Sequence, residues 1–504
     1  MNFRPYIPLC TLALLWASVP VGGQDVSLQK QLERKLADPA LASAQVGVCV
    51  RKMSGETVAE INGKKMFVPA SNMKVITTGS ALHSLGGDFR FETTLAYSGR
   101  IEGGSLNGDL YIVGGADPTL ASRDSIAQPI AALFADWTKM IKSAGIRRIE
   151  GHVVGDGRWF EAMPEEESWL WNDLGTYYGC GTTGLMFYEN TQSFLISPGP
   201  KVGDNLKIEV YYPKTPWMEY RYECSTGAAK TGDLLYMYTT EFAPVGILRG
   251  TLGVDVKRKR VDCSNKFPEY TCADYFADYL DKAGVPNGGA GDFRLGKTAG
   301  TQTYMPAGTP PLTKLGSTYS PTLRRIVFEA NHASNNLYCE AILRTLGKLS
   351  TGSDCYDSSY VALNAALASV MQLPGKKPIE GLHVKDGSGL SRQNYVSPDF
   401  FCRFLRNMML SPSFEDFAAS LPTPGGEGSL QYNMGSHSKA LKERIIAKSG
   451  SMNGVRCYSG YVTPRNKCTD DTLIFSVMVN NCCAPTWKIK KILDEIMALI
   501  AENC

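Results

Sequence analysis

Hydrophobic and polar positions follow a helical period at several places along the chain. Apolar residues that recur three and four positions apart predict helices at 26–43, 70–85, 320–346, 360–372, 398–410 and 486–502. Short apolar runs predict strands at 45–50, 57–61, 444–449, 454–463 and 472–480. Helices and strands are therefore expected together at both ends of the chain.

The pattern of apolar and polar residues changes in the middle of the chain. From about residue 93 to residue 300, short β-like runs alternate with turns rich in Gly, Asn and Asp, as in 103–115. One helix is expected there, near 126–144. The pattern indicates β-rich material inserted between the two ends.

The first residues carry the signature of a secretory signal peptide. Arg4 is the only charge before an apolar run at 7–19, and small residues precede a cleavage site expected after Gly23. An N-terminal membrane anchor is the alternative, although the run is short for a span. No later segment has the length and apolarity of a transmembrane helix. We expect residues 1–23 to be removed and the mature protein to be exported, soluble and without stable membrane insertion.

The charge and the cysteine content narrow the possible classes of protein further. The formal net charge is +3 with acidic and basic residues interspersed, which gives no indication of nucleic-acid binding. The chain has fourteen cysteines, of which Cys10 would leave with the signal peptide. Disulfides are permitted outside the cytoplasm, and Cys263 and Cys272 could close a small loop. No CxxC pair with matching spacing supports zinc, so no metal is predicted.

Three short motifs stand in one order along the chain. Ser71 and Lys74 form S-x-x-K, Ser334 and Asn336 form S-x-N, and Lys448-Ser449-Gly450 forms K-[S/T]-G. These are the three active-site elements of serine enzymes that react with penicillin. Each pattern is common by chance, and the chain holds decoys that begin at Ser27, Ser436, Ser105, Ser451 and Lys230.

Local context separates the chosen motifs from their decoys. Ser71 and Lys74 fall on one turn at a predicted helix start, where free N–H groups and a nearby amine can make a serine nucleophilic. Lys448 ends a predicted strand whose edge can bind an extended peptide. Lys230 lies inside the inserted region and precedes Ser334. A Ser-His-Asp hydrolase is a weaker hypothesis, because no G-x-S-x-G motif accompanies the five histidines.

With these motifs placed, the chain resembles the D-alanyl-D-alanine carboxypeptidase/endopeptidase family of class C low-molecular-mass penicillin-binding proteins, peptidase family S13. The resemblance runs from about residue 30 to residue 500. Beyond the three motifs it rests on the segments 108–118, 151–156, 171–179 and 386–392. The long gap between the first two motifs is also typical of this family, whereas Ser449 stands where the family usually has threonine.

The resemblance implies an α/β (α+β) fold. It consists of a penicillin-binding transpeptidase-like domain, built from 24–92 and 301–504, with an antiparallel sheet between helices. The β-rich region 93–300 would hold two nested inserted domains. The family is periplasmic or otherwise extracytoplasmic, acts on peptidoglycan stem peptides, is inhibited covalently by β-lactams and needs no cofactor.

The resemblance also implies roles for individual residues. Ser71 would be the nucleophile and Lys74 the general base, while Ser334 would relay a proton to the leaving D-alanine and Lys448 would shape the electrostatic field. The residues expected to bind the substrate are Asn336, Ser449, Gly450 and Ser451, with Ser71 and Ser451 supplying oxyanion-hole N–H groups. A pocket for a diamino acid of the stem peptide would be lined by Asp156, Phe160 and Arg392.

Three alternatives remain open from the sequence. The enzyme could be mainly a DD-endopeptidase that cuts crosslinks with the same residues. A β-lactamase is a further hydrolase, but the inserted domains argue against it. A non-catalytic wall-binding or scaffolding protein would require decayed motifs, and all three motifs are intact.

Overall fold

The computed structural model describes residues 27–298, 301–373, 379–465 and 469–504 of the 504-residue chain. The predicted signal peptide, residues 1–23, lies outside these ranges. Within them, none of the helices combines the length and the apolar character that crossing a membrane requires.

A five-stranded antiparallel sheet joins the two ends of the chain in the order β19-β20-β21-β1-β2. Its strands are β1 (Gln45–Lys52), β2 (Thr57–Ile61), β19 (Ile445–Met452), β20 (Val455–Val462) and β21 (Leu473–Asn480). The pleat sends successive side chains to opposite faces. In β1, Val48 and Val50 enter one apolar core and Cys49 enters the other. The sheet therefore has two buried faces.

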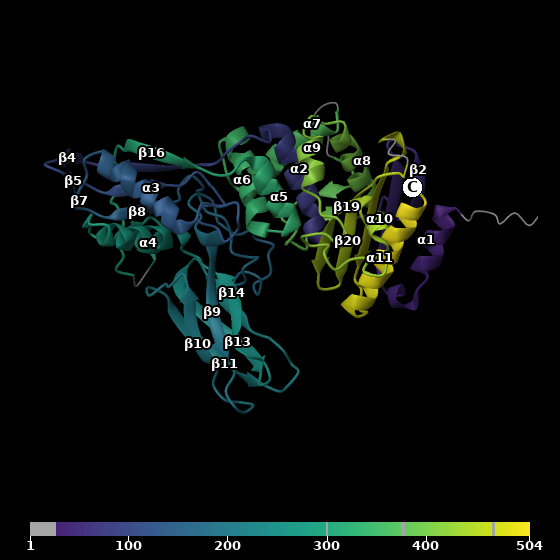
Figure 1. Ribbon diagram of the computed structural model, residues 1–504, viewed down its shortest axis with the longest axis horizontal. Helices are drawn as coiled ribbons and strands as arrows, with labels where there is room; N and C mark the ends of the chain where they lie inside the picture. Colours follow the sequence, from purple (N-terminus) through teal and green to yellow (C-terminus); the bar gives the residue numbers. More distant parts are fainter. Residues whose placement is uncertain (1–26, 299–300, 374–378, 466–468) are drawn as a thin grey trace, which may run out of the picture.

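Helices cover both faces of this sheet (Figure 1). On the side of Val48 lie α1 (Leu28–Leu36) and α11 (Thr486–Glu502). On the side of Cys49 lie α2 (Met73–Leu85), α5 (Leu323–His332), α6 (Asn336–Thr351), α7 (Tyr356–Val370), α8 (Pro398–Met409) and α9 (Phe414–Ala419). An antiparallel sheet between helices confirms the predicted α/β (α+β) fold class.

The inserted region builds a second sheet at the far end of the molecule (Figure 1), in the order β15-β8-β6-β3-β16. Its strands are β3 (Glu92–Tyr97), β6 (Leu110–Val113), β8 (Val153–Asp156), β15 (Ala290–Asp292) and β16 (Thr313–Tyr319). The helices α3 (Ile130–Ser143) and α4 (Pro268–Lys282) share one apolar core with this sheet. Because β16 pairs with β3, the inserted sheet extends beyond the boundary expected at residue 300.

A third group of strands projects from this second sheet (Figure 1). Its members are β9 (Thr191–Ser197), β10 (Lys207–Tyr212), β11 (Glu219–Gly227), β12 (Tyr236–Thr240), β13 (Ala243–Gly253) and β14 (Lys259–Ser264). They form two three-stranded sheets with a small core of their own. The shorter elements are β4 (Arg100–Glu102), β5 (Ser105–Asn107), β7 (Arg148–Ile149), β17 (Leu382–His383), β18 (Tyr395–Val396), α10 (Lys439–Lys442) and the 3-10 helices η1 (Pro39–Leu41), η2 (Ala70–Asn72), η3 (Tyr188–Asn190), η4 (Leu295–Lys297) and η5 (Thr469–Asp471).

Three expectations need correction. The helical stretch predicted at 320–346 is two helices, α5 and α6, which are separated at Ser334 by a left-handed backbone with φ of 57°. The inserted region holds a second long helix, α4, in addition to the one predicted near 126–144. Cys263 and Cys272 are not joined, because both are buried free thiols in β14 and α4.

Candidate functional site

Ser71 lies on the short helix η2, directly before α2. The preceding residue, Ala70, has a φ of 47°, a left-handed conformation that costs an alanine about 1–3 kcal/mol. Two glycines pack closely against this turn. A Cβ on Gly389 would lie 1.9 Å from the carbonyl oxygen of Ala70, and one on Gly450 would lie 2.3 Å from that of Pro69. The close packing fixes the backbone that presents Ser71.

Lys74 lies one turn after Ser71 and is completely buried. Its Nζ is 3.1 Å from Ser71 Oγ, 2.6 Å from Asn336 Oδ1 and 2.7 Å from the carbonyl oxygen of Ser388. Burial lowers the pKa of Lys74, while the neighbouring Cys339, Asp386 and Glu340 act in the opposite direction. Asn336 Oδ1 and the Ser388 carbonyl can only accept a hydrogen bond, whereas the Ser71 hydroxyl can accept or donate. A proton can therefore pass from Ser71 to a neutral Lys74 with all three contacts kept.

Ser334 and Lys448 form a second serine–lysine pair. Ser334 occupies the left-handed break between α5 and α6, and its Oγ is 2.9 Å from Lys448 Nζ. The same Nζ donates to the carbonyl oxygen of Ser449 at 2.9 Å. Lys448 is fully buried. Burial, followed by the like charge of Lys74, lowers the pKa of Lys448 well below its ordinary value. The pair can therefore exchange a proton in the same way.

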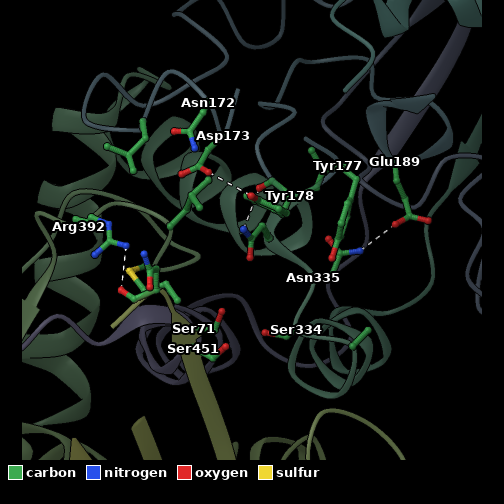
Figure 2. A pocket seen from close by; sticks show the side chains of 18 of the residues that line it. Ser71, Asn172, Asp173, Tyr177, Tyr178, Glu189, Ser334, Asn335, Arg392 and Ser451 are labelled. Atoms are coloured by element: carbon green, nitrogen blue, oxygen red, sulfur yellow. Dashed lines mark hydrogen bonds between the residues drawn. The ribbon is translucent and has the colours of Figure 1, made fainter. Parts of the chain in front are cut away.

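A cleft of about 730 Å³ opens above these residues (Figure 2). It is lined by Ser71, Ser334, Asn336 and Ser451 among others, and Ser451 directly follows the third motif. Because Lys448 contacts Ser334, the structure brings the three motifs to one place. Ser451 belongs to β19, which is the edge strand of the main sheet and lies beside η2. The hydroxyl of Ser449, on the same strand, lies 3.1 Å from Ser429 Oγ. An unpaired strand edge next to a serine can receive an extended peptide.

Charged groups stand at one end of the cleft, away from Ser334 (Figure 2). Arg392 reaches in from the main domain and donates to the Asn453 carbonyl at 3.1 Å. Asp173, from the inserted region, accepts from the Tyr178 hydroxyl at 3.2 Å. Burial raises the pKa of Asp173, while Tyr178 and Arg392 act to lower it. A carboxylate and a guanidinium therefore line the same pocket.

Asp156 and Phe160, expected beside Arg392, lie elsewhere. Asp156 is buried in β8 and pairs with Arg158 at 2.7 Å. Phe160 is also buried, and the guanidinium of Arg344 lies 4.5 Å from its ring centre. It lines a separate cavity of about 350 Å³. The sequence placed the acidic residue of the pocket at Asp156, and the structure has Asp173 in that position instead.

Except for Ser451, which directly follows the third motif and lines the cleft, the residues that begin the decoy motifs are not among the described residues that line it. Ser27, Ser436 and Lys230 are exposed, and the backbone N–H of Lys230 donates to the carboxylate of Asp255. No histidine is among the described residues that line the cleft.

One cluster of possible metal ligands occurs in the described ranges. It consists of Cys49, Glu60 and Asp399, which have ligand atoms within 4.8 Å of one another. The oxygens of Asp399 already accept from Arg51 at 2.5 Å and Arg403 at 2.8 Å. Two guanidinium cations beside the same carboxylate oppose the binding of a metal cation.

Sequence reasoning missed several groups that shape the site. Asp173 and Tyr178 lie in the segment 171–179, which contributed to the family resemblance without a role. Tyr236 of β12 also lines the cleft. The Ser388 carbonyl belongs to the turn 386–392, where only Arg392 was singled out. Backbone acceptors leave no signal in a sequence, so Ser388 could not have been found from its side chain.

Comparison with known proteins agrees with this geometry. The profile of the D-Ala-D-Ala carboxypeptidase 3 (S13) family matches residues 28–503. The D-alanyl-D-alanine carboxypeptidase of Actinomadura sp. (strain R39) is 27% identical over 495 residues, covering 95% of this chain and 86% of the relative. The penicillin-sensitive carboxypeptidase A of Dictyostelium discoideum is 25% identical over 464 residues, covering 88% and 84%.

A solved structure has the same fold. Penicillin binding protein 4 from Haemophilus influenzae superposes with a TM-score of 0.77 at 21% identity, covering 95% of this chain and 99% of that chain. Fold and site thus define a serine-type peptidase of the penicillin-binding class. The chain belongs to the D-Ala-D-Ala carboxypeptidase 3 (S13) family, which confirms the resemblance seen in the sequence.

Proposed function

We propose that this protein removes the terminal D-alanine from peptidoglycan stem peptides through an acyl-enzyme on Ser71. One observation carries the proposal: Lys74 Nζ is buried and lies 3.1 Å from Ser71 Oγ. A buried amine favours its neutral form, and a neutral amine at this distance can take the hydroxyl proton. The family to which the chain belongs supplies the substrate class.

In the first step, Ser71 Oγ attacks the carbonyl carbon of the penultimate D-alanine while its proton passes to Lys74 Nζ. The carbonyl oxygen becomes an oxyanion in the resulting tetrahedral intermediate. We assign its stabilisation to the backbone N–H groups of Ser71 and Ser451, a contribution of about 3–4 kcal/mol per donor in such sites. The close contact of Gly450 with the turn before Ser71 supports this assignment, because it brings β19 next to the serine.

In the second step, the intermediate collapses and the bond between carbonyl carbon and nitrogen breaks. The leaving D-alanine takes a proton at its nitrogen from Ser334 Oγ, and Lys448 Nζ returns a proton to Ser334. The distance of 2.9 Å between these two atoms supports the relay. Water then attacks the Ser71 ester, one water proton restores the Ser71 hydroxyl, and the shortened peptide leaves with a new carboxyl group that ionises. Lys74 loses the proton it took and Lys448 regains the one it gave, so both lysines return to their starting states.

Substrate placement falls to the strand edge and to the polar groups around it. The peptide would lie against β19 and be held by backbone groups there. Ser449 and Lys448 would bind the terminal carboxylate, and the Asn336 amide would bind the peptide backbone. Asn336 Nδ2 already donates to the Tyr178 carbonyl at 2.9 Å, so its side chain is oriented before the peptide arrives.

We assign Arg392 and Asp173 to the diamino acid of the stem peptide. Such a side chain ends in an ammonium and a carboxylate, and a guanidinium with a carboxylate is its charge complement. Both residues line the cleft at the same end (Figure 2). Asp173 thereby takes the role that the family resemblance assigned to Asp156.

A DD-endopeptidase activity on crosslinks is the second candidate. The cleft continues past Ser334 to Asn335 and Glu189 (Figure 2), which leaves room for a leaving group larger than D-alanine. A non-catalytic scaffolding role is disfavoured, because both serine–lysine pairs are within hydrogen-bond distance. The apolar run at 7–19 supports export, so we place the mature enzyme in the periplasm or another extracytoplasmic space.

The first prediction concerns the nucleophile. Fluorescent penicillin should acylate Ser71 alone. Two serines of the cleft contact a buried lysine, but only Ser71 lies on the turn that packs against β19, whereas Ser334 lies at the break between α5 and α6. Mass spectrometry of the labelled peptide identifies the site, and Ser71→Ala should abolish labelling. Label on Ser27, Ser436 or any other serine would contradict the assignment, as would full labelling of Ser71→Ala.

The second prediction compares two lysines from similar motifs. Lys448→Ala should slow acylation by penicillin about 30- to 1000-fold, since it removes about 2–4 kcal/mol of transition-state stabilisation. Lys230→Ala should leave the rate nearly unchanged, because Lys230 is exposed on the inserted region. Stopped-flow measurement of labelling gives both rates. Comparable losses in the two variants would show that the wrong motif has been chosen.

The third prediction concerns substrate recognition. Asp173→Asn and Arg392→Gln should each lower kcat/KM about 10- to 100-fold for a stem peptide with a free diamino acid, since each loses a charged hydrogen bond. Both variants should react normally with penicillin, which lacks that side chain. Asp156→Asn is the control and should not discriminate between the two substrates. Equal losses for peptide and penicillin would place Asp173 and Arg392 in the catalytic centre or the fold.

A further inference from the structure

Helix α6 presents two side chains, one turn apart, to the surroundings of Lys74. Asn336, at the start of the helix, accepts a hydrogen bond from Lys74 Nζ through its Oδ1. Glu340, four residues later, lies on the same helix face and is 1% exposed. Its carboxylate accepts from the backbone N–H of Gly387 at 3.1 Å and of Ser388 at 2.7 Å. A buried carboxylate thus lies directly beneath the turn that carries the Ser388 carbonyl.

Carboxylates bind the N–H groups of the turn 386–392, and side chains of α2 bind its carbonyl groups. Asp386 accepts from the N–H groups of Gly389 at 2.7 Å and Ser391 at 2.5 Å. Thr77 donates to the Gly387 carbonyl at 2.7 Å, and Lys74 donates to the Ser388 carbonyl at 2.7 Å. A peptide N–H and the carbonyl of the preceding residue share one plane, so fixing the N–H also fixes that carbonyl. Glu340 therefore orients the Asp386 and Gly387 carbonyls and anchors the amide of Ser388. The Ser388 carbonyl shares its plane with the Gly389 N–H, which Asp386 binds, so its position depends on both carboxylates.

We propose that Glu340 is a positioning residue for Lys74. Through the N–H groups of Gly387 and Ser388 it anchors the amide of Ser388, and with it the turn whose Ser388 carbonyl contacts Nζ, while its negative charge sets how readily Lys74 gives up its proton. This inference rests on the proposed role of Lys74 as the base. Glu340 itself does not touch the reacting atoms.

The charged and titratable groups around Glu340 come from four elements. They are Lys74 on α2, Cys339 on α6, Tyr356 and Tyr360 on α7, and Asp386 in the turn. Arg344, one turn further along α6, is bound to Asp354 at 2.5 Å. Burial and the adjacent Asp386 raise the pKa of Glu340 to about 8.

The sign of the effect on Lys74 follows from Coulomb attraction. Above its own pKa of about 8, Glu340 is negative, which favours the protonated form of Lys74 and so raises the pKa of that lysine. A neutral residue at position 340 removes this attraction, and Lys74 then loses its proton at a lower pH. The acid limb of the acylation rate, which reports the appearance of neutral Lys74, should move to lower pH.

The test is the pH dependence of acylation by fluorescent penicillin between about pH 5 and pH 10, a range that brackets the shifted lysine. The rate constant of acylation is taken from the time course of labelling, relative to the protein that finally becomes labelled. An unfolded fraction therefore does not affect it. Glu340→Gln should move the midpoint of the acid limb down by about one pH unit. It should also lower the plateau about 10- to 100-fold, because the misplaced carbonyl no longer orients Lys74. Glu340→Asp keeps the charge, so it should keep the midpoint and lower only the plateau.

The matched control is Asp494→Asn. Asp494 is also a buried carboxylate that accepts a backbone N–H, from Met434 at 2.9 Å, but it lies on α11 across the main sheet. It should alter neither midpoint nor plateau. A wild-type midpoint in Glu340→Gln, with or without a lower plateau, would overturn the proposal. If that variant yields no labelled protein, Glu340→Asp decides, and a wild-type plateau there would overturn it.

A further variant separates this inference from the proposed function. Lys74→Ala should abolish acylation if Lys74 is the base, whatever Glu340 does. Rapid acylation of Lys74→Ala would contradict the proposed function itself.

Discussion

The burial of Lys74 is the constraint on which the rest of the site depends. Its ammonium is removed from water and meets three oxygens, which belong to Ser71, to Asn336 of α6 and to the Ser388 carbonyl of a distant turn. A buried charge is tolerated only when it is well bonded, and here the bonding is completed by segments far apart in the sequence. The same burial makes loss of the proton easier, which turns a structural cost into a chemical advantage. Lys448, buried beside Lys74 and Ser334, repeats the arrangement on the other side of the nucleophile.

Close backbone packing and local strain keep these contacts in register. Gly389 and Gly450 approach the turn before Ser71 from two different segments, at distances that admit no side chain. Ala70 and Ser334 both adopt left-handed backbone conformations next to the two serine–lysine pairs. Such conformations persist only where the surroundings enforce them, and they are concentrated at functional sites. The inserted region completes the cleft through Asp173, Tyr178 and Tyr236, so it contributes to recognition as well as to size.

The sequence predicted most of the main domain and the centre of the site. The strands β19, β20 and β21 and the helix α11 were predicted within a few residues, because their apolar periods are regular. Two of the three motifs fall where a helix begins, and the third lies within the edge strand β19. The sequence could not show the break at Ser334, since helical periodicity continues through α5 and α6 on both sides of it. The resemblance assigned Asp156 to the diamino-acid pocket, yet pairing with Arg158, two residues further along the chain, occupies Asp156 in the fold.

The central claim is that Lys74 can be neutral in the resting enzyme near physiological pH. It can be measured directly by NMR of protein labelled at the lysine Cε carbons, with the Lys74 signal assigned from a Lys74→Arg sample. The account predicts that this signal titrates below the ordinary lysine pKa of about 10.4. A Lys74 signal that remains that of an ammonium until the exposed lysines have titrated would contradict the account.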